Sequence, residues 1–158
     1  MFKSKLDNKS EQNIINMLCD HDQISSEQLS KIKKGSPEIG KTELETAFEF
    51  KFTDEEKILN TLSSTYSLEI VNLSEKKLTE EILNVLGLRF LESNQIAPFE
   101  LDNNLLKISI PDGSKLSLIK SIENMSGKRV EIFASQITEV SNFIEKLKKA
   151  KESGEDSD

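Results

Sequence analysis

Residues Gln95–Pro111 read Q-I-A-P-F-E-L-D-N-N-L-L-K-I-S-I-P, and the fold is built around this stretch. Two apolar runs flank Asp102-Asn103-Asn104, residue types that readily adopt turn geometries with positive φ. In the second run, apolar and polar residues alternate over Leu106–Ile110, which is the period-2 pattern of a strand with one buried face. Pro98 in the first run lacks an amide donor and therefore belongs at a sheet edge or a bulge. The stretch predicts a β-hairpin.

A two-stranded hairpin buries too little apolar surface to be stable alone, so neighbouring segments must support it. The apolar patterns around it predict a strand at Leu68–Leu73, a helix at about Leu78–Leu86, a helix from Lys115 to about Met125, a strand at Arg129–Ala134 and a helix from Gln136 to about Lys149. Residues 68–149 are therefore expected to form a compact αβ subdomain with a mostly antiparallel sheet of three to four strands.

The sequence before residue 68 has only helical periodicity. Ser25 with Gln28 and Thr42 with Glu45 have the spacing of capping boxes, which start helices. We expect an all-helical subdomain at residues 10–67, a disordered N-terminus at residues 1–9 and a disordered acidic tail at residues 150–158. The expected fold class is α+β, with a small helical unit followed by the αβ unit.

Composition excludes several classes of partner. The net charge of −7 over 158 residues argues against nucleic acid, because phosphate binding needs clustered lysine and arginine. No apolar run approaches the roughly 20 residues that span a bilayer, so direct membrane insertion is not expected. The first ten residues lack the apolar segment of a secretory signal, and the single cysteine allows no internal disulfide. These features favour a cytoplasmic location.

No catalytic, metal-binding or cofactor-binding constellation is recognisable. Cys19 and His21 lie two residues apart on a helix and do not share a face, which makes them a poor metal pair. The adjacent acids Glu55-Glu56 and Glu80-Glu81 fall in the first turns of helices, where the helix dipole favours them. Gly40-Lys41-Thr42 matches only the end of a phosphate-binding loop and is interpreted as an ordinary turn and N-cap. We therefore expect no enzyme activity, no cofactor and no small-molecule ligand.

The order of motifs from about residue 40 to residue 147 resembles the N-terminal domain of type II secretion and type IV pilus assembly ATPases. The matching segments are Asp54–Leu59, Leu68–Leu73, Leu78–Leu86, Gln95–Phe99, Leu106–Asp112, Ser126–Glu131 and Ala134-Ser135. The resemblance implies a docking or regulatory domain that binds the cytoplasmic part of an inner-membrane assembly-platform protein, and so a possible peripheral position at that membrane. The ATPase half of the family, with its phosphate-binding loop, is absent from this sequence.

A subset of this family binds cyclic di-GMP through repeated Arg-Leu-Gly-x-x-Leu segments, which gives an alternative function as a nucleotide-sensing module. The nearest stretch here is Glu38–Glu43, with an acid in the place of the arginine. Because a carboxylate repels a dinucleotide phosphate, the docking function is preferred.

Phe48, Phe50 and Phe52 gather within five residues near the end of an expected helix. They are interpreted either as core residues or as an apolar patch that faces a partner. Aromatic residues are enriched among binding hot spots, so these three are the candidate partner-binding residues.

Overall fold

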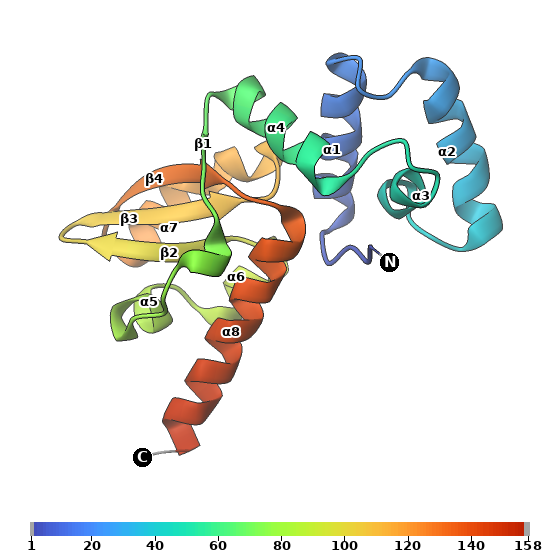
Figure 1. Cartoon of the computed structure of the whole chain (residues 1–158). Coiled ribbons are helices and arrows are strands. Elements are labelled where there is room, and N and C mark those ends of the chain that lie inside the picture. The colour runs from blue at the N-terminus through green and yellow to red at the C-terminus, as the bar shows by residue number, and fades with distance from the viewer. Residues whose placement is uncertain (1, 157–158) are drawn as a thin grey trace.

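The computed structural model describes residues 2–156, the last four of them only as helical backbone. Figure 1 shows a helical half on one side and a sheet with its own helices on the other. The helical half consists of α1 Asn8–Asp20, α2 Ser26–Ile39, α3 Glu43–Glu49 and α4 Glu55–Tyr66. Within the described residues that precede Leu68 there is no strand, in agreement with the helical periodicity of the sequence.

The starts of α2 and α3 are set by the capping boxes that the sequence predicts. The Ser25 hydroxyl accepts a hydrogen bond from the Gln28 amide, and the Gln28 side chain accepts one from the Ser25 amide. Thr42 and Glu45 repeat this exchange at the start of α3. Each box satisfies amide donors that the first turn of a helix leaves unpaired, so both helix starts are fixed locally.

The sheet has four strands in the order β1-β4-β3-β2. The strands are β1 Glu69–Ile70, β2 Ala97–Asp102, β3 Leu105–Ile110 and β4 Arg129–Ala134. β2 and β3 form the predicted antiparallel hairpin, and Asn103 in its turn has a positive φ of 55°. The register shifts between Pro98 and Glu100 on β2, which is an edge strand, so the interpretation of Pro98 is also confirmed.

The fold class is α+β as predicted, but the sheet is mixed and not mostly antiparallel. β4 pairs in parallel with β3 and also with β1. Between β3 and β4 the chain crosses over through η2, a 3-10 helix at Gly113–Leu118, and α7 Ile119–Ser126. A helical crossover returns the chain to the starting end of the sheet, so the next strand runs in the same direction as the previous one. β1 is also shorter than the predicted Leu68–Leu73, because Ile70 already pairs with Ala134, the last residue of β4.

The remaining helices complete the αβ half. They are η1 Leu73–Glu75, α5 Glu80–Val85, α6 Leu88–Asn94 and α8 Ile137–Asp156. Figure 1 shows α7 behind the sheet and the long α8 extending from the sheet toward the C-terminus. The core of this half joins strand residues such as Ile108 to Phe143 and Ile144 of α8 and Ile122 of α7, all almost fully buried.

A second hydrophobic cluster lies in the helical half. It is built on Ile14, Leu18, Leu44 and Leu62 and also takes in Ile137 from the start of α8. The boundary between subdomains at residues 67 and 68 stays a prediction, which the two separate clusters support. None of the described helices is both long enough and apolar enough to cross a membrane.

Both ends of the chain differ from the sequence-based expectation. Residues 1–9 were expected to be disordered, whereas α1 begins at Asn8 and Phe2 packs on Phe48. Burial of the apolar Phe2 and Leu6 against the helical cluster gives this segment a reason to be ordered. Of the acidic tail expected to be disordered at residues 150–158, residues 150–156 continue α8, and residues 157–158 lie outside the described part.

Candidate docking site

The three candidate phenylalanines are all half-buried, and the structure separates them into two groups. Phe50 and Phe52 contact each other edge to face, with ring centroids 5.7 Å apart and an interplanar angle of 73°. Phe48 pairs instead with Phe2, and the two rings stack at 3.8 Å with an interplanar angle of 10°. Phe48 and Phe52 also pack against the helical cluster, and the role of the three phenylalanines in partner binding stays a prediction.

Phe50 has a structural role between two helices. It is the C-cap residue of α3, and its ring lies against Gly35 of α2. A Cβ atom at residue 35 would come within 2.5 Å of Cζ of Phe50, so only glycine leaves room for the ring. Phe50 therefore fixes α2 against α3 and is not among the lining residues of the groove described next.

Phe48 lines a groove of about 530 Å³ at the junction of the two halves. Three segments form the walls: the N-terminal residues, the region from α3 to the start of α4, and the first turns of α8. The lining residues are Phe2, Lys3, Lys5, Phe48, Asp54, Glu55, Ile137, Thr138, Ser141 and Asn142. The groove thus combines a stacked aromatic wall with charged and amide side chains.

Glu55 connects the two halves at the floor of this groove. Its Oε1 accepts a hydrogen bond of 2.6 Å from the Thr138 amide, and its Oε2 accepts one of 2.7 Å from the Thr138 hydroxyl. The Thr138 amide is one of the donors that the first turn of α8 leaves without a helical partner. A carboxylate from α4 therefore caps α8 and holds the two walls of the groove together.

The N-terminal wall is held by carboxylates on neighbouring elements. The Ser4 amide donates to Oε2 of Glu45 at 2.9 Å. Burial acts to raise the pKa of Glu45, but hydrogen bonds from the Ser4 and Thr42 amides lower it below its ordinary value. Nζ of Lys5 lies 3.8 Å from Oε1 of Glu145 on α8, and this exposed ion pair contributes little to stability.

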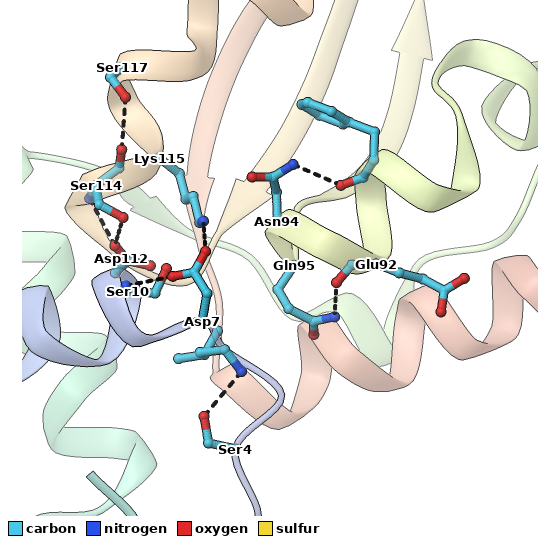
Figure 2. A network of polar contacts seen from close by, with 12 residues as sticks. Ser4, Asp7, Ser10, Glu92, Asn94, Gln95, Asp112, Ser114, Lys115 and Ser117 are labelled. Atoms are coloured by element: carbon cyan, nitrogen blue, oxygen red, sulfur yellow. Dashed lines mark hydrogen bonds and ion pairs between the residues drawn. The ribbon is translucent and has the colours of Figure 1, made fainter. Parts of the chain in front are cut away.

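Figure 2 shows how Asp7 ties the N-terminal segment to the αβ half. Its Oδ1 accepts from the Ser10 amide at 2.8 Å, and its Oδ2 accepts from Nζ of Lys115 at 3.3 Å. Burial acts to raise the pKa of Asp7, but the Ser10 amide and the Lys115 ammonium together lower it. The Lys115 side chain is almost fully buried in η2, and the half-exposed carboxylate of Asp7 supplies its counter-charge.

The other residues considered from sequence have ordinary structural environments. Burial raises the pKa of the Cys19 thiol, and His21 contacts Thr65 through Nε2 at 3.1 Å. Gly40 ends α2 with a φ of 67°, and Thr42 caps α3, so Gly40-Lys41-Thr42 is the turn and N-cap that the sequence predicts. In the described part of the chain, no group of three or more histidine, cysteine or acidic side chains could hold a metal ion.

Several groove residues could not be identified from the sequence. Phe2 stands in a polar segment, and only its spacing of four residues from Leu6 hints at a packed role. Glu55 and Glu56 are equivalent first-turn acids in the sequence, and only the fold shows that Glu55 reaches α8.

Comparison with known proteins gives the family. Residues 66–154 match the family described as MshEN domain, which is more than half of the chain. The chain belongs to the MshEN domain family. This confirms the predicted membership in the N-terminal domain family of type II secretion and type IV pilus assembly ATPases. No curated protein matches the chain.

Two solved structures have a similar fold. A structure of MshE with cdg is 16% identical, covers 85% of this chain and 97% of its own, and has a TM-score of 0.62. The N-terminal domain of XpsE is 18% identical, covers 92% of this chain and 96% of its own, and has a TM-score of 0.61. A second crystal form of the XpsE domain gives a TM-score of 0.52. Because the XpsE match covers 92% of this chain, the similarity reaches well into the helical half, beyond the residues of the MshEN match.

Proposed function

We propose that this MshEN domain is a non-enzymatic docking domain that binds the cytoplasmic part of an inner-membrane assembly-platform protein. The observation that carries the proposal is the junction groove, where the stacked pair of Phe2 and Phe48 faces the first turns of α8. The site is cytoplasmic in this proposal, and the partner brings the domain to the membrane surface.

The side chains in the groove suit binding better than catalysis. Phe48 offers an aromatic ring that is already held in place by Phe2, so little side-chain conformational entropy is lost when a partner binds it. Glu55 is occupied in capping α8 and is not free to act as an acid or base on a substrate. These features favour a protein partner over a reacting substrate.

The test is a calorimetric titration of the full chain with the purified cytoplasmic part of the assembly-platform protein from the same organism. Saturable binding with one site per chain supports the proposal. Absence of binding at concentrations of about 100 μM, well above those of typical specific complexes, overturns it. ATP turnover above a buffer control that is lost on Lys41→Ala would overturn the non-enzymatic part.

Cyclic di-GMP sensing is the second candidate, because the related MshE structure was solved with cdg. The charge of this chain weighs against it. Glu38 stands where the family's first arginine belongs and is exposed on α2. This carboxylate and the net charge of −7 would both repel the two phosphates of the dinucleotide. A titration with cyclic di-GMP separates the candidates, since tight binding would favour sensing over docking alone.

A further inference from the structure

Residues 2–6 form an extended strap along one wall of the junction groove. The strap contains no helix or strand, and its even-numbered residues are half-buried whereas Lys3 and Lys5 are exposed. A period of two is that of an extended chain with one side against the protein. Phe2 and both lysines line the groove, which keeps an open volume of about 530 Å³. The strap is therefore a wall of the groove and does not fill it.

The C-terminal end of the strap is fixed to both halves of the protein. Asp7 follows the strap directly, caps α1 through the Ser10 amide and accepts a hydrogen bond from Nζ of Lys115 in η2. Lys115 is itself almost fully buried. Any opening of the strap therefore turns about Asp7, and the end with Phe2 moves furthest.

The N-terminal end of the strap is held by fewer contacts. The Ser4 amide donates a 2.9 Å hydrogen bond to Oε2 of Glu45, and the Leu6 amide donates one of 3.1 Å to the Ser4 hydroxyl. Only the first of these two bonds ties the strap to another element. Past Ser4, the stack of Phe2 on Phe48 is the outermost ring contact within the described residues. Because segments without helical or ladder hydrogen bonds open at low free-energy cost, Phe2 acts as the latch of the strap.

We propose that the strap opens and closes at Phe2, and that the partner binds the groove while the strap is closed. The inference rests on the proposed docking function and names the moving part of that site. In the closed strap, Phe2 holds the ring of Phe48 and completes the wall of the groove. In the open strap, the groove lacks this wall. A partner that binds the closed state better shifts the equilibrium toward closure.

The experiment is amide hydrogen exchange of the full chain, followed by NMR at Ser4 and Leu6. Both amides donate hydrogen bonds in the closed strap, so their exchange reports its opening. Phe2→Ala removes the latch, and Glu45→Gln weakens the bond to the Ser4 amide with a residue type that still completes a capping box. Phe90→Ala is the matched control, because Phe90 is a half-buried phenylalanine that packs on the core of the αβ half.

We expect Phe2→Ala to speed exchange of both amides by about tenfold and Glu45→Gln by about threefold or more, while Phe90→Ala stays within about twofold of the unchanged chain. The measurement is then repeated on the unchanged chain with the assembly-platform cytoplasmic part. At about ten times its Kd, a partner that binds only the closed strap slows exchange by about tenfold through mass action.

Equal exchange rates in Phe2→Ala, Glu45→Gln and Phe90→Ala overturn the latch. If the partner binds but leaves the exchange of Ser4 and Leu6 unchanged, closure on the partner is overturned and the docking function stands. If the partner does not bind, the docking function and closure on the partner fall together.

Discussion

Glu55 offers a sharp test of how the two halves are joined. Glu55→Ala removes both hydrogen bonds to Thr138, of 2.6 and 2.7 Å, and leaves the first turn of α8 without this cap. Loss of a helix cap costs about 0.5–2 kcal/mol. Bonds to a charged carboxylate are stronger than average, but Glu55 is partly exposed, so we expect about 1–2 kcal/mol of lost stability.

The matched control is Glu56→Ala. Glu55 and Glu56 are neighbours in the first turn of α4 and interact with the same helix dipole, but Glu56 is exposed and makes no hydrogen bond or ion pair with α8 within the described part of the chain. Urea unfolding followed by circular dichroism gives the free energy of unfolding for each variant. Glu55→Ala should lower the midpoint clearly more than Glu56→Ala does. Equal midpoints would refute the capping role of Glu55 and the connection that we draw between α4 and α8.

Three further predictions concern stability. Ile108→Ala removes three fully buried carbons, each worth about 0.8 kcal/mol, and with the cavity it leaves should lower the free energy of unfolding in urea by about 2–4 kcal/mol. Lys107→Ala, on the opposite face of β3, should hardly move the urea midpoint. Equal shifts of the midpoint in both variants would contradict the assignment of faces. Gly113→Ala should lower the thermal midpoint, because its methyl group would overlap the Tyr66 ring, and Tyr66→Ala should relieve the loss in the double variant; additive losses would disprove the clash. The pKa of Asp7 is lowered in the folded protein, so its ionised carboxylate stabilises the fold at pH values above the ordinary pKa. This stability is lost as the pH falls through the folded pKa. Asp7→Asn should therefore flatten the decline of the thermal midpoint between about pH 5 and about pH 3. An unchanged slope would show that Asp7 contributes nothing to acid stability.

Local signals in the sequence were sufficient for the helix starts and the hairpin. The boxes at Ser25 and Thr42 act within one turn, and the Asn103 turn acts between adjacent strands, so both are decided by a few neighbouring residues. The sheet was expected to be mostly antiparallel and is mixed, because the direction of β4 depends on how the segment η2–α7 crosses the sheet and not on the residues of β4.

The candidate site was only partly accessible from the sequence. The phenylalanine cluster led to Phe48, but nothing local shows that Phe48 stacks on Phe2 or that Phe50 is needed against Gly35. The groove depends on contacts between residues more than 80 positions apart, such as Glu55 with Thr138. Such contacts follow from the packing of whole elements, so composition and periodicity do not reveal them.

The central claim is that the partner docks in the junction groove. The most direct measurement is the affinity of the assembly-platform cytoplasmic part for Phe48→Ala, with Thr138→Arg as a second variant. Thr138 is exposed in the groove, and its replacement spares the aromatic stack but removes the hydroxyl bond to Glu55, a loss that Glu55→Ala measures separately. Truncation of an aromatic hot spot costs about 2 kcal/mol or more, so we predict a loss of affinity of at least about thirtyfold for Phe48→Ala. Thr138→Arg should also weaken binding, while both variants keep a folded circular dichroism spectrum. Unchanged affinity in both variants would contradict the account.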